Sequence, residues 1–543
     1  MPPRKRTDKA AVSAPSTMKE LKDTLWKAAD KLRGSMDASQ YKDVILGLVF
    51  LKYVSDAFDE RREQIRAELV ADGMNDEQIS YLIDDEDEYV GGSVFYVPEP
   101  ARWSYLAQNA KGIQEAVGVE GRTVGELVDA AMRELMQANA TLAGTLPTIF
   151  NNSSVDQRRL GELIDLFNDT RFTGHGATKA RDLLGEVYEY FLEKFARAEG
   201  KRGGEFYTPA GVVRVLVEML EPYSGRVYDP ACGSGGMFVQ TEKFIERHGG
   251  NPTEVAVYGQ ELNERTWRMA KMNLAIHGIT GNLGDRWEDT FAQDKHPDLL
   301  ADYVLANPPF NIKDWTRKED DKRWKFGVPP VGNANYAWIQ HIISKLSERG
   351  SAGVVMANGS MSSNSGGEGE IRARLVEADL VSCMIALPTQ LFRSTGIPVC
   401  VWFFAKDKAI GPKGSIDRQG QVLFIDARSM GYMVDRAERA LSDGDDGDIA
   451  KIARTFHAWR GTESAAGAEY ADEPGFCYSA TLAEIKEADY ALTPGRYVGA
   501  APLEDDGEPI AEKLERLTKE LFEQFDESAR LQAVVREQLG RVL

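Results

Sequence analysis

The feature that most constrains this chain is the alternation of short apolar segments with helical ones between residues 226 and 427. Apolar runs of strand length stand at 226–229, 255–259, 301–306, 352–357, 381–387, 398–405 and 421–426. Stretches with helical periodicity separate most of them, at 235–248, 263–277, 336–349 and 369–378. Such alternation is typical of an α/β fold with a mostly parallel sheet, and the close spacing of the last strands predicts an antiparallel hairpin at its edge.

Helical periodicity dominates on both sides of this region. Leu21, Leu25, Ala28 and Leu32 repeat at steps of three and four residues, as one face of a helix does. We expect a disordered tail at 1–16, a helical N-terminal domain at 17–150, an α/β domain at 151–430 and a C-terminal region at 431–543. Within the last region, the apolar stripe of residues 511–543 predicts a helix that packs in the core or docks on a partner.

The composition excludes several classes of protein. Hydrophobic residues make up 43% and charged residues 28%, which is ordinary for a globular protein. The longest apolar run, 44–51, is far shorter than the roughly 20 residues of a membrane helix, and the N-terminus does not resemble a signal peptide. We therefore expect a cytoplasmic protein without a membrane partner.

The cysteines and the net charge narrow the choice further. Cys232, Cys383, Cys400 and Cys477 form no CxxC pair, which argues against a disulfide scaffold and against a metal site. The net charge of −20 argues against a broad DNA-coating surface, because phosphate contacts depend on Lys and Arg. The negative net charge does not exclude a local basic groove, or a partner that supplies the positive charge.

The first motif with chemical meaning runs from Val227 to Gly236, where a strand leads through a glycine-rich turn into a helix. Glycines there allow the backbone to approach a ligand closely. The GK[ST] sequence of a nucleotide-triphosphate loop and the full GxGxxG dinucleotide pattern are both missing. Asp229 is placed to pair with a cationic or amino-bearing ligand, although a plain strand–helix turn would look similar.

The next strand ends near Glu261, 26 residues after Gly235. Cofactor-binding α/β folds often carry an acidic residue near this position to bind ribose hydroxyls. A helix-capping role for Glu261 is the alternative.

The most specific motif is Asn307-Pro308-Pro309-Phe310, directly after the strand at 301–306. The prolines hold the backbone rigid, so that the Asn307 amide oxygen and the Pro308 carbonyl can both accept hydrogen bonds. Phe310 offers a flat apolar face. Two acceptors beside an aromatic ring suit a planar base that carries an amino group.

Three motifs in this order, Glu205-Phe206-Tyr207-Thr208-Pro209, then Asp229 to Gly235, then Asn307 to Phe310, resemble the amino-group DNA methyltransferases of the gamma arrangement. The chain also resembles, more narrowly, the modification (M) subunit of type I restriction-modification systems. The narrower resemblance rests on residues 183–191, 333–338, 387–392 and 490–498, and on the helical segment from Thr17 to about 150.

The resemblance implies a Rossmann-like methyltransferase domain that uses S-adenosylmethionine to methylate the exocyclic amino group of a flipped adenine in DNA. It assigns cofactor contacts to Glu205, Phe206, Tyr207, Thr208, Pro209, Asp229, Cys232, Gly233, Ser234, Gly235, Glu261 and Asp285. Asp289 is the alternative to Asp285 at the cofactor adenine. Asn307 and Pro308 would bind the target amino group, and Pro309 and Phe310 complete the catalytic motif, with Phe392 or Trp324 as a second stacking face.

The resemblance also implies the partners. A separate specificity (S) subunit would recognise the DNA sequence, two M copies would flank it, and a restriction (R) subunit would complete the system. Two alternatives stay open at this point. The first is a cofactor-binding scaffold with little activity of its own, and the second is a self-sufficient methyltransferase of adenine or cytosine amino groups.

Overall fold

The computed structural model describes residues 18–30, 32, 36, 38–92, 94–110, 123–169, 180–199, 208–392, 397–500 and 510–542. The expected tail at 1–16 and the cofactor candidates Glu205, Phe206 and Tyr207 lie outside the described residues. The chain divides into two compact units, Met1–Val498 and Gly499–Leu543, and each is considered by itself.

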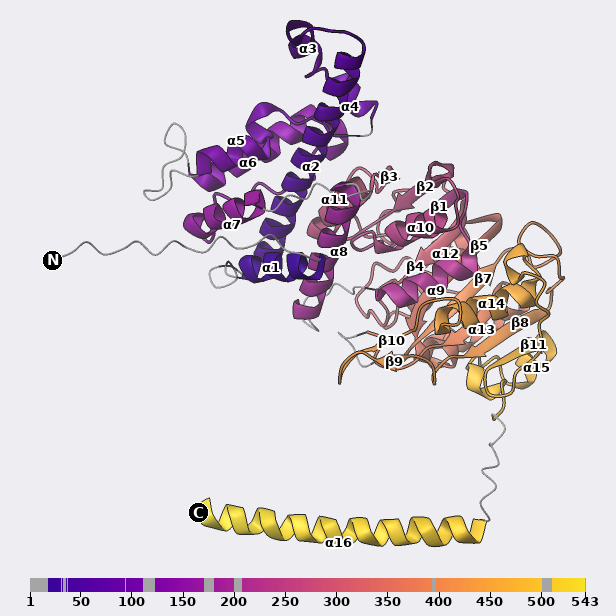
Figure 1. Ribbon diagram of the computed structural model, residues 1–543. Helices are drawn as coiled ribbons and strands as arrows, with labels where there is room; N and C mark the ends of the chain where they lie inside the picture. Colours follow the sequence, from indigo (N-terminus) through magenta and orange to yellow (C-terminus); the bar gives the residue numbers. More distant parts are fainter. Residues whose placement is uncertain are drawn as a thin grey trace. The chain divides into compact units, whose positions relative to one another are not determined.

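A nine-stranded sheet forms the centre of the first unit (Figure 1). Its strands are β1 (Gly225–Asp229), β2 (Val255–Gly259), β3 (Gly281–Asn282), β4 (Ala301–Ala306), β5 (Leu346–Ala357), β6 (Val381–Ala386), β7 (Val399–Ala405), β8 (Gln421–Asp426) and β11 (Cys477–Thr481). They lie in the order β11-β8-β6-β7-β5-β4-β1-β2-β3. Every strand expected from the apolar runs is present, so the α/β prediction is confirmed.

The antiparallel strand lies elsewhere than expected. Strand β7 runs antiparallel to both of its neighbours, β5 and β6, inside the sheet. All of its residues are buried, which is typical of a strand that is covered on both faces. At this end of the sheet the edge strand is β11, which pairs antiparallel with β8. The predicted antiparallel pairing among the last apolar runs is therefore confirmed for β6 and β7, but their predicted position at the edge of the sheet is wrong.

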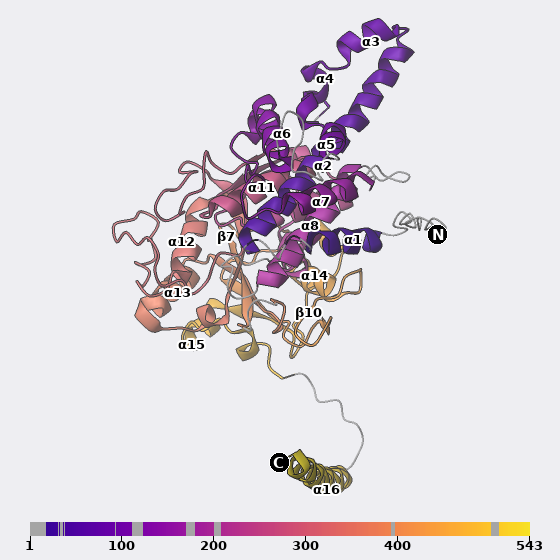
Figure 2. The same cartoon turned by 90° about the vertical axis from the view of Figure 1, so that its left-hand side faces the viewer.

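Helices cover both faces of the sheet and enclose two apolar cores. One core includes residues of α9 (Ala210–Leu220), α10 (Gly236–Arg247), α11 (Glu264–His277) and α14 (Asp448–Arg460). The other includes residues of α12 (Asn335–Lys345), α13 (Glu368–Glu377) and α15 (Leu482–Glu487). Figure 2 shows α12 and α13 on one side of β7 and α14 on the other. Side chains that alternate along β4 enter the two cores in turn, as Leu305 and Ala306 do.

The N-terminal region is helical, as predicted. It contains α1 (Met18–Asp30), α2 (Ala38–Ala71), α3 (Asp76–Leu82), α4 (Glu86–Val90), α5 (Trp103–Asn109), α6 (Val124–Ala138), α7 (Gln157–Asp169) and α8 (Ala180–Glu199). Their buried residues form a third core, which also includes Met269, Met272 and Ile276 of α11. Helix α11 therefore belongs to two cores. The domain boundaries at 150 and 430 stay predictions.

Two smaller features complete the description. A short antiparallel pair, β9 (Tyr432–Met433) and β10 (Arg439–Ala440), lies outside the main sheet. The second unit holds α16 (Ile510–Val542), which confirms the predicted C-terminal helix and exposes Leu514, Leu517, Leu521 and Phe525. Of the helices in the described ranges, none is long and apolar enough to cross a membrane.

Candidate active site

The topology of the sheet places the site at the carboxyl ends of β1 and β4. The chain passes from β1 outward to β2 and β3, and then returns to the other side of β1 as β4. Ligands of open α/β sheets bind in the crevice at such a reversal. Asp229 is the last residue of β1, and Asn307 directly follows β4. The first and third sequence motifs therefore lie at neighbouring strand ends.

The turn after β1 depends on glycine at two positions. Gly233 and Gly235 have φ angles of 55° and 79°, in the left-handed region that other residues rarely adopt. The Gly235 amide donates to the Cys232 carbonyl at 2.8 Å, and α10 begins at the next residue. Glu261 holds the turn from the neighbouring strand, because its carboxylate accepts the amide protons of Gly233 at 3.1 Å and Asn263 at 2.9 Å.

Asp229 is a buried carboxylate, with 2% of its surface exposed. Its Oδ1 accepts the Ala231 amide proton at 3.0 Å. Burial raises the pKa of Asp229 to about 8, and the nearby charge of Glu261 adds to the shift. A cationic or amino-bearing ligand would favour the ionised carboxylate, so the side chain is suited to bind one.

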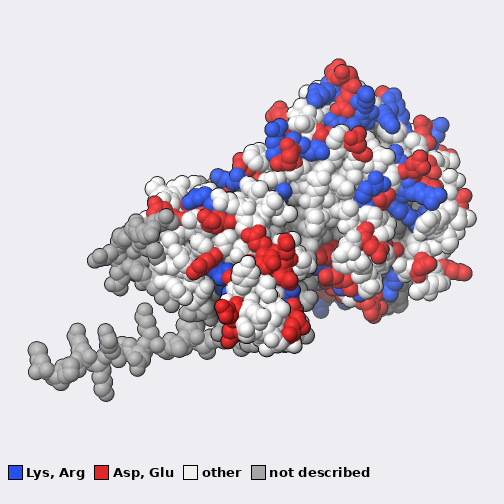
Figure 3. Space-filling model, turned by 90° about the horizontal axis from the view of Figure 1, so that it is seen from above, with Lys and Arg blue, Asp and Glu red and all other residues white. Residues whose placement is uncertain are grey.

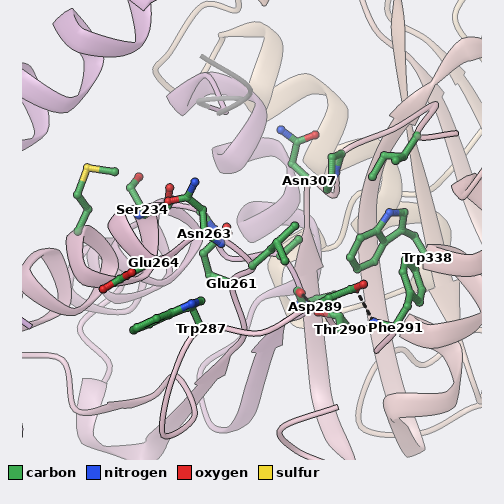
Figure 4. Close-up of a pocket in the computed structure, with 18 of the residues that line it drawn as sticks. Ser234, Glu261, Asn263, Glu264, Trp287, Asp289, Thr290, Phe291, Asn307 and Trp338 are labelled. Carbon is green, nitrogen blue, oxygen red and sulfur yellow. Dashed lines mark hydrogen bonds between the residues drawn. The ribbon is translucent and has the colours of Figure 1, made fainter. Parts of the chain in front are cut away.

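A cavity of about 600 Å³ opens beside this turn (Figure 4). Glu261, Trp287 and Asn307 are arranged around the same space in the close-up. Its lining also includes Lys42, Leu192, Phe195, Pro230, Ala231, Gly233, Ser234, Leu262, Asn263, Glu264, Thr266, Met269, Asp289, Thr290, Phe291, Pro309, Ile312, Asp314, Trp315 and Trp338. A small second pocket of about 60 Å³ shares Asn307 with the cavity and is lined by Asp229, Cys232 and Thr208.

Asn307 presents an unused hydrogen-bond acceptor to this space. Its Nδ2 donates to the Thr208 hydroxyl at 2.8 Å, which fixes the orientation of the amide. Its Oδ1 is buried and has no hydrogen-bond partner among the residues that the structure describes. An unsatisfied buried acceptor costs about 1–3 kcal/mol, and a ligand with an N–H group would recover this free energy. The geometry agrees with the predicted contact to an amino group.

The other residues of the NPPF motif are buried or partly buried. Pro308 is buried, and Pro309 lines the cavity. Phe310 and Phe392 belong to the core that α9 and α10 share, and neither lines the cavity. Trp324 lies in a separate aromatic cluster with Phe291, Trp315 and Trp338, and those three residues do line the cavity. The stacking roles of Phe310, Phe392 and Trp324 stay predictions.

The two acidic candidates after β3 lie in different surroundings. Asp285 is exposed and forms an ion pair with Lys295, with 3.0 Å between Oδ1 and Nζ, and it does not line the cavity. Asp289 lines the cavity, where its oxygens accept the Phe291 amide proton at 2.8 Å and the Thr316 hydroxyl at 2.5 Å. The arrangement therefore favours Asp289 over Asp285 for a ligand contact.

Several cavity residues were missed in the sequence. Leu262 and Trp287 are apolar yet 65% and 36% exposed, so they offer apolar surface to a ligand. Lys42, Leu192 and Phe195 reach the cavity from the N-terminal helices α2 and α8. The sequence carried no signal for these three, because only the packing of distant helices brings them to the sheet.

The long loop at 312–335 is ordered around Arg323. The Arg323 guanidinium donates to the Thr290 carbonyl at 2.9 Å and to the Phe291 carbonyl at 3.2 Å, and it pairs with Asp321. Thr290 and Phe291 are cavity residues, and the loop itself supplies Ile312, Asp314 and Trp315 to the lining. The loop is therefore one wall of the cavity.

Comparison with known proteins agrees with this arrangement. The family described as N-6 DNA Methylase matches residues 179–506, and the HsdM N-terminal domain matches residues 21–167. The type I restriction enzyme HindI methylase subunit of Haemophilus influenzae is 49% identical over 82% of this chain and 99% of that protein. The MjaIX methylase subunit of Methanocaldococcus jannaschii is 38% identical over 95% of this chain and 90% of that protein.

The fold is also shared with solved structures. The type I restriction-modification methyltransferase subunit of Streptococcus thermophilus superimposes with a TM-score of 0.69 at 24% identity, over 89% of this chain and 100% of that chain. The sheet has a cavity at its switch point, and the match to the N-6 DNA Methylase family over residues 179–506 assigns it to the DNA-modifying α/β methyltransferases. The chain belongs to the N-6 DNA methylase family, as a methylase subunit of the type I restriction-modification class. The predicted resemblance and the predicted adenine-specific DNA methyltransferase activity are therefore confirmed.

Proposed function

We propose that this chain transfers a methyl group from S-adenosylmethionine to the exocyclic amino group of a flipped adenine, at sites chosen by a separate specificity subunit. The main support for the proposal is the position of the Asn307 amide. Its oxygen is buried without a described partner, beside a cavity of about 600 Å³.

The residues of the cavity fit this cofactor. Its volume lies in the usual range of about 300–1,000 Å³ for small-molecule sites. Asp229 suits the ammonium of the methionine part, and Glu261 suits the ribose hydroxyls. Leu262 and Trp287 offer apolar surface for the purine, with Asp289 in place of Asp285 at its amino group.

The remaining predicted contacts surround the same space. Thr208 lines the small pocket with Cys232, and Gly233 and Ser234 line both pockets. Pro209 precedes α9, and Gly235 precedes α10. When bound, S-adenosylmethionine supplies a methyl group on a positively charged sulfur.

The chain itself prepares the target amino group. The Asn307 Oδ1 and the Pro308 carbonyl would each accept one N–H of the adenine amino group, which draws its lone pair out of the ring. The same acceptors stabilise the positive charge that develops on the nitrogen. Thr208 keeps the Asn307 oxygen pointed at the base. Flipping the adenine out of the duplex costs a few kcal/mol, which contacts in the site must offset.

No residue needs to attack the base. Burial raises the pKa of the Cys232 thiol, so it is not a thiolate at neutral pH. Cys232 lies within the glycine turn, where its carbonyl accepts the Gly235 amide proton, so we assign it a structural role. The proposal is thus direct transfer without a covalent intermediate.

The acidic balance supports a division of labour between subunits. The net charge is −20, and Figure 3 shows Lys and Arg interspersed with Asp and Glu over the described part of the face in view. Because phosphate contacts depend on Lys and Arg, we infer that partner subunits supply part of the DNA affinity. The relatives are named methylase subunits of type I restriction enzymes. We propose an S subunit, a second copy of this chain and an R subunit as partners, with the exposed stripe of α16 as a docking element for S.

Mapping of methylated bases tests this function. DNA from cells that express the chain with and without a neighbouring S subunit would be sequenced at the single-molecule level. Methyladenine at a defined split site, only when both subunits are present, is the expected result. Asn307→Ala should abolish it while complex assembly persists. Methylation that survives Asn307→Ala would overturn the catalytic assignment, and methylation by the chain alone would overturn the borrowed specificity.

A further inference from the structure

One wall of the cavity comes from the N-terminal helical region. Lys42 lies on α2, and Leu192 and Phe195 lie on α8. Leu192 also lines the small pocket that holds Asp229, so this wall adjoins the end of the site proposed for the methionine part of the cofactor. The helical region therefore takes part in forming the cavity.

The wall is held in place through helix α11. The Tyr53 hydroxyl of α2 donates to the Ile276 carbonyl at 2.9 Å, and the Tyr188 hydroxyl of α8 donates to the Met269 carbonyl at 3.4 Å. Asp43, next to Lys42, forms an ion pair with Arg265 in the first turn of α11 at 3.5 Å. These contacts fix α2 and α8 along the length of α11. At the start of α11, next to the Asp43–Arg265 pair, Glu264 and Thr266 line the cavity.

Lys42 stands out by its charge. Its side chain and backbone together are 4% exposed. It is the single Lys or Arg among the described residues that line the cavity, which also carry the carboxylates of Glu261, Glu264, Asp289 and Asp314. A ligand carboxylate would be repelled by these four carboxylates, and among the charged side chains of the described lining Lys42 alone would attract it. The Lys42 ammonium is therefore the position in the cavity where a ligand carboxylate is favoured.

We propose that Lys42 binds the carboxylate of the cofactor, so that the helical region contributes directly to cofactor affinity. This inference rests on the proposed function. Asp229 would hold the ammonium and Lys42 the carboxylate of one amino acid group, from opposite parts of the fold. Binding would then join α2 to the catalytic sheet, and the docking of the helical region would be linked to occupancy of the site.

The test compares two ligands that differ in the amino acid group. S-adenosylhomocysteine has it, and methylthioadenosine has none. Calorimetric titration of the full chain would give the dissociation constants for wild type and Lys42→Met, which keeps the length of the side chain. A hydrogen bond between charged groups is worth about 1.5–3 kcal/mol, so Lys42→Met should weaken S-adenosylhomocysteine about 10- to 100-fold. Methylthioadenosine should bind both proteins within about twofold, since it lacks the carboxylate.

Three companion variants make the result specific. Lys42→Arg retains the charge and should lose less than Lys42→Met. Lys27→Met, at an exposed position on α1, should leave both affinities unchanged. Glu261→Gln should weaken both ligands, because both carry the ribose. The melting temperature of each variant shows whether it is folded.

The outcomes separate the inference from the proposed function. Two results would overturn the role of Lys42 and leave the proposed cofactor site intact. One is that Lys42→Met lowers the affinity for both ligands equally. The other is that Lys42→Met lowers neither affinity while Glu261→Gln lowers both. No effect of either variant would overturn the site itself. Hydrogen exchange gives a second readout, because S-adenosylhomocysteine should slow exchange of amides around residue 42 of α2 in wild type and not in Lys42→Met.

Discussion

Replacing Asp229 by Asn removes the charge of one buried carboxylate and retains its shape. Burial raises the pKa of Asp229 from the ordinary value of 3.8 to about 8. Between about pH 4 and pH 8 the folded chain therefore keeps a proton on Asp229 that the unfolded chain has already released. A group whose pKa is raised on folding in this way makes the folded state less stable as the pH increases through that window.

The magnitude follows from the size of the pKa change. Each pKa unit corresponds to about 1.36 kcal/mol, so ionisation of Asp229 costs at most about 5 kcal/mol by pH 8. Relaxation and water in the adjoining pocket reduce this cost, and we expect about 2 kcal/mol, or about 2 °C in Tm for a unit of this size. Asn keeps an oxygen for the Ala231 amide and does not ionise. The Tm of the variant should therefore rise by about 2 °C relative to wild type between pH 5 and pH 8.5.

The assay is the melting temperature of wild type and Asp229→Asn from pH 5 to pH 9. Asp285→Asn is the matched control, because its ion pair with Lys295 lowers the pKa of Asp285 and its contribution is constant above pH 5. A difference between wild type and Asp229→Asn that stays constant over this range would refute the raised pKa. The same substitution should weaken S-adenosylhomocysteine at least about tenfold, since it removes the partner of the ligand ammonium.

Other substitutions probe the catalytic motif, the cavity wall and the helical region. Asn307→Ala should lower the methylation rate at least about 100-fold with S-adenosylhomocysteine affinity unchanged, and a parallel loss of affinity would contradict this. Arg323→Met leaves two buried carbonyls unpaired and should cost about 2–4 kcal/mol, seen as lower Tm and faster proteolysis of the loop after β4. Gly125→Ala would place a Cβ 2.1 Å from the Phe150 carbonyl oxygen and should lower Tm by several degrees. Gly211→Ala, where the nearest atom lies at 3.8 Å, is its control, and equal Tm values would refute the steric argument.

The strands were predictable because most are apolar runs bounded by turn residues. Strand β6, for example, is buried along its whole length and needs no alternating pattern to be seen. Strand β3 has two residues, and β11 is half-buried at an edge, so neither gave a clear apolar run. The close spacing of the last apolar runs indicated antiparallel pairing, as β6 and β7 show, but it did not reveal that β7 lies between β5 and β6.

In the candidate site, too, some residues could be predicted from the sequence and others could not. Asp229 ends a strand that the sequence located, and Glu261 and Asn307 follow two others, so their meeting at one edge of the sheet could be expected. Asp289 follows a loop whose path depends on buried Gln260, which binds the carbonyls of Glu288 and Gln293. Spacing along the chain does not reveal such a path, and for this reason Asp285 and Asp289 could not be separated beforehand.

Helix α11 explains why the helical region and the sheet behave as one compact unit. Trp267, Ala270 and Leu274 belong to a core of the sheet, while Met269, Met272 and Ile276 belong to the core of the helical region. Burying a large apolar side chain contributes about 1.5–3 kcal/mol, so exposing the second set would cost on the order of 5 kcal/mol or more. A catalytic domain without the helical region would carry that cost beside the ligand cavity. The contacts that stabilise α11 are therefore next to those that keep the cavity intact, which makes the helical region a structural part of the methyltransferase.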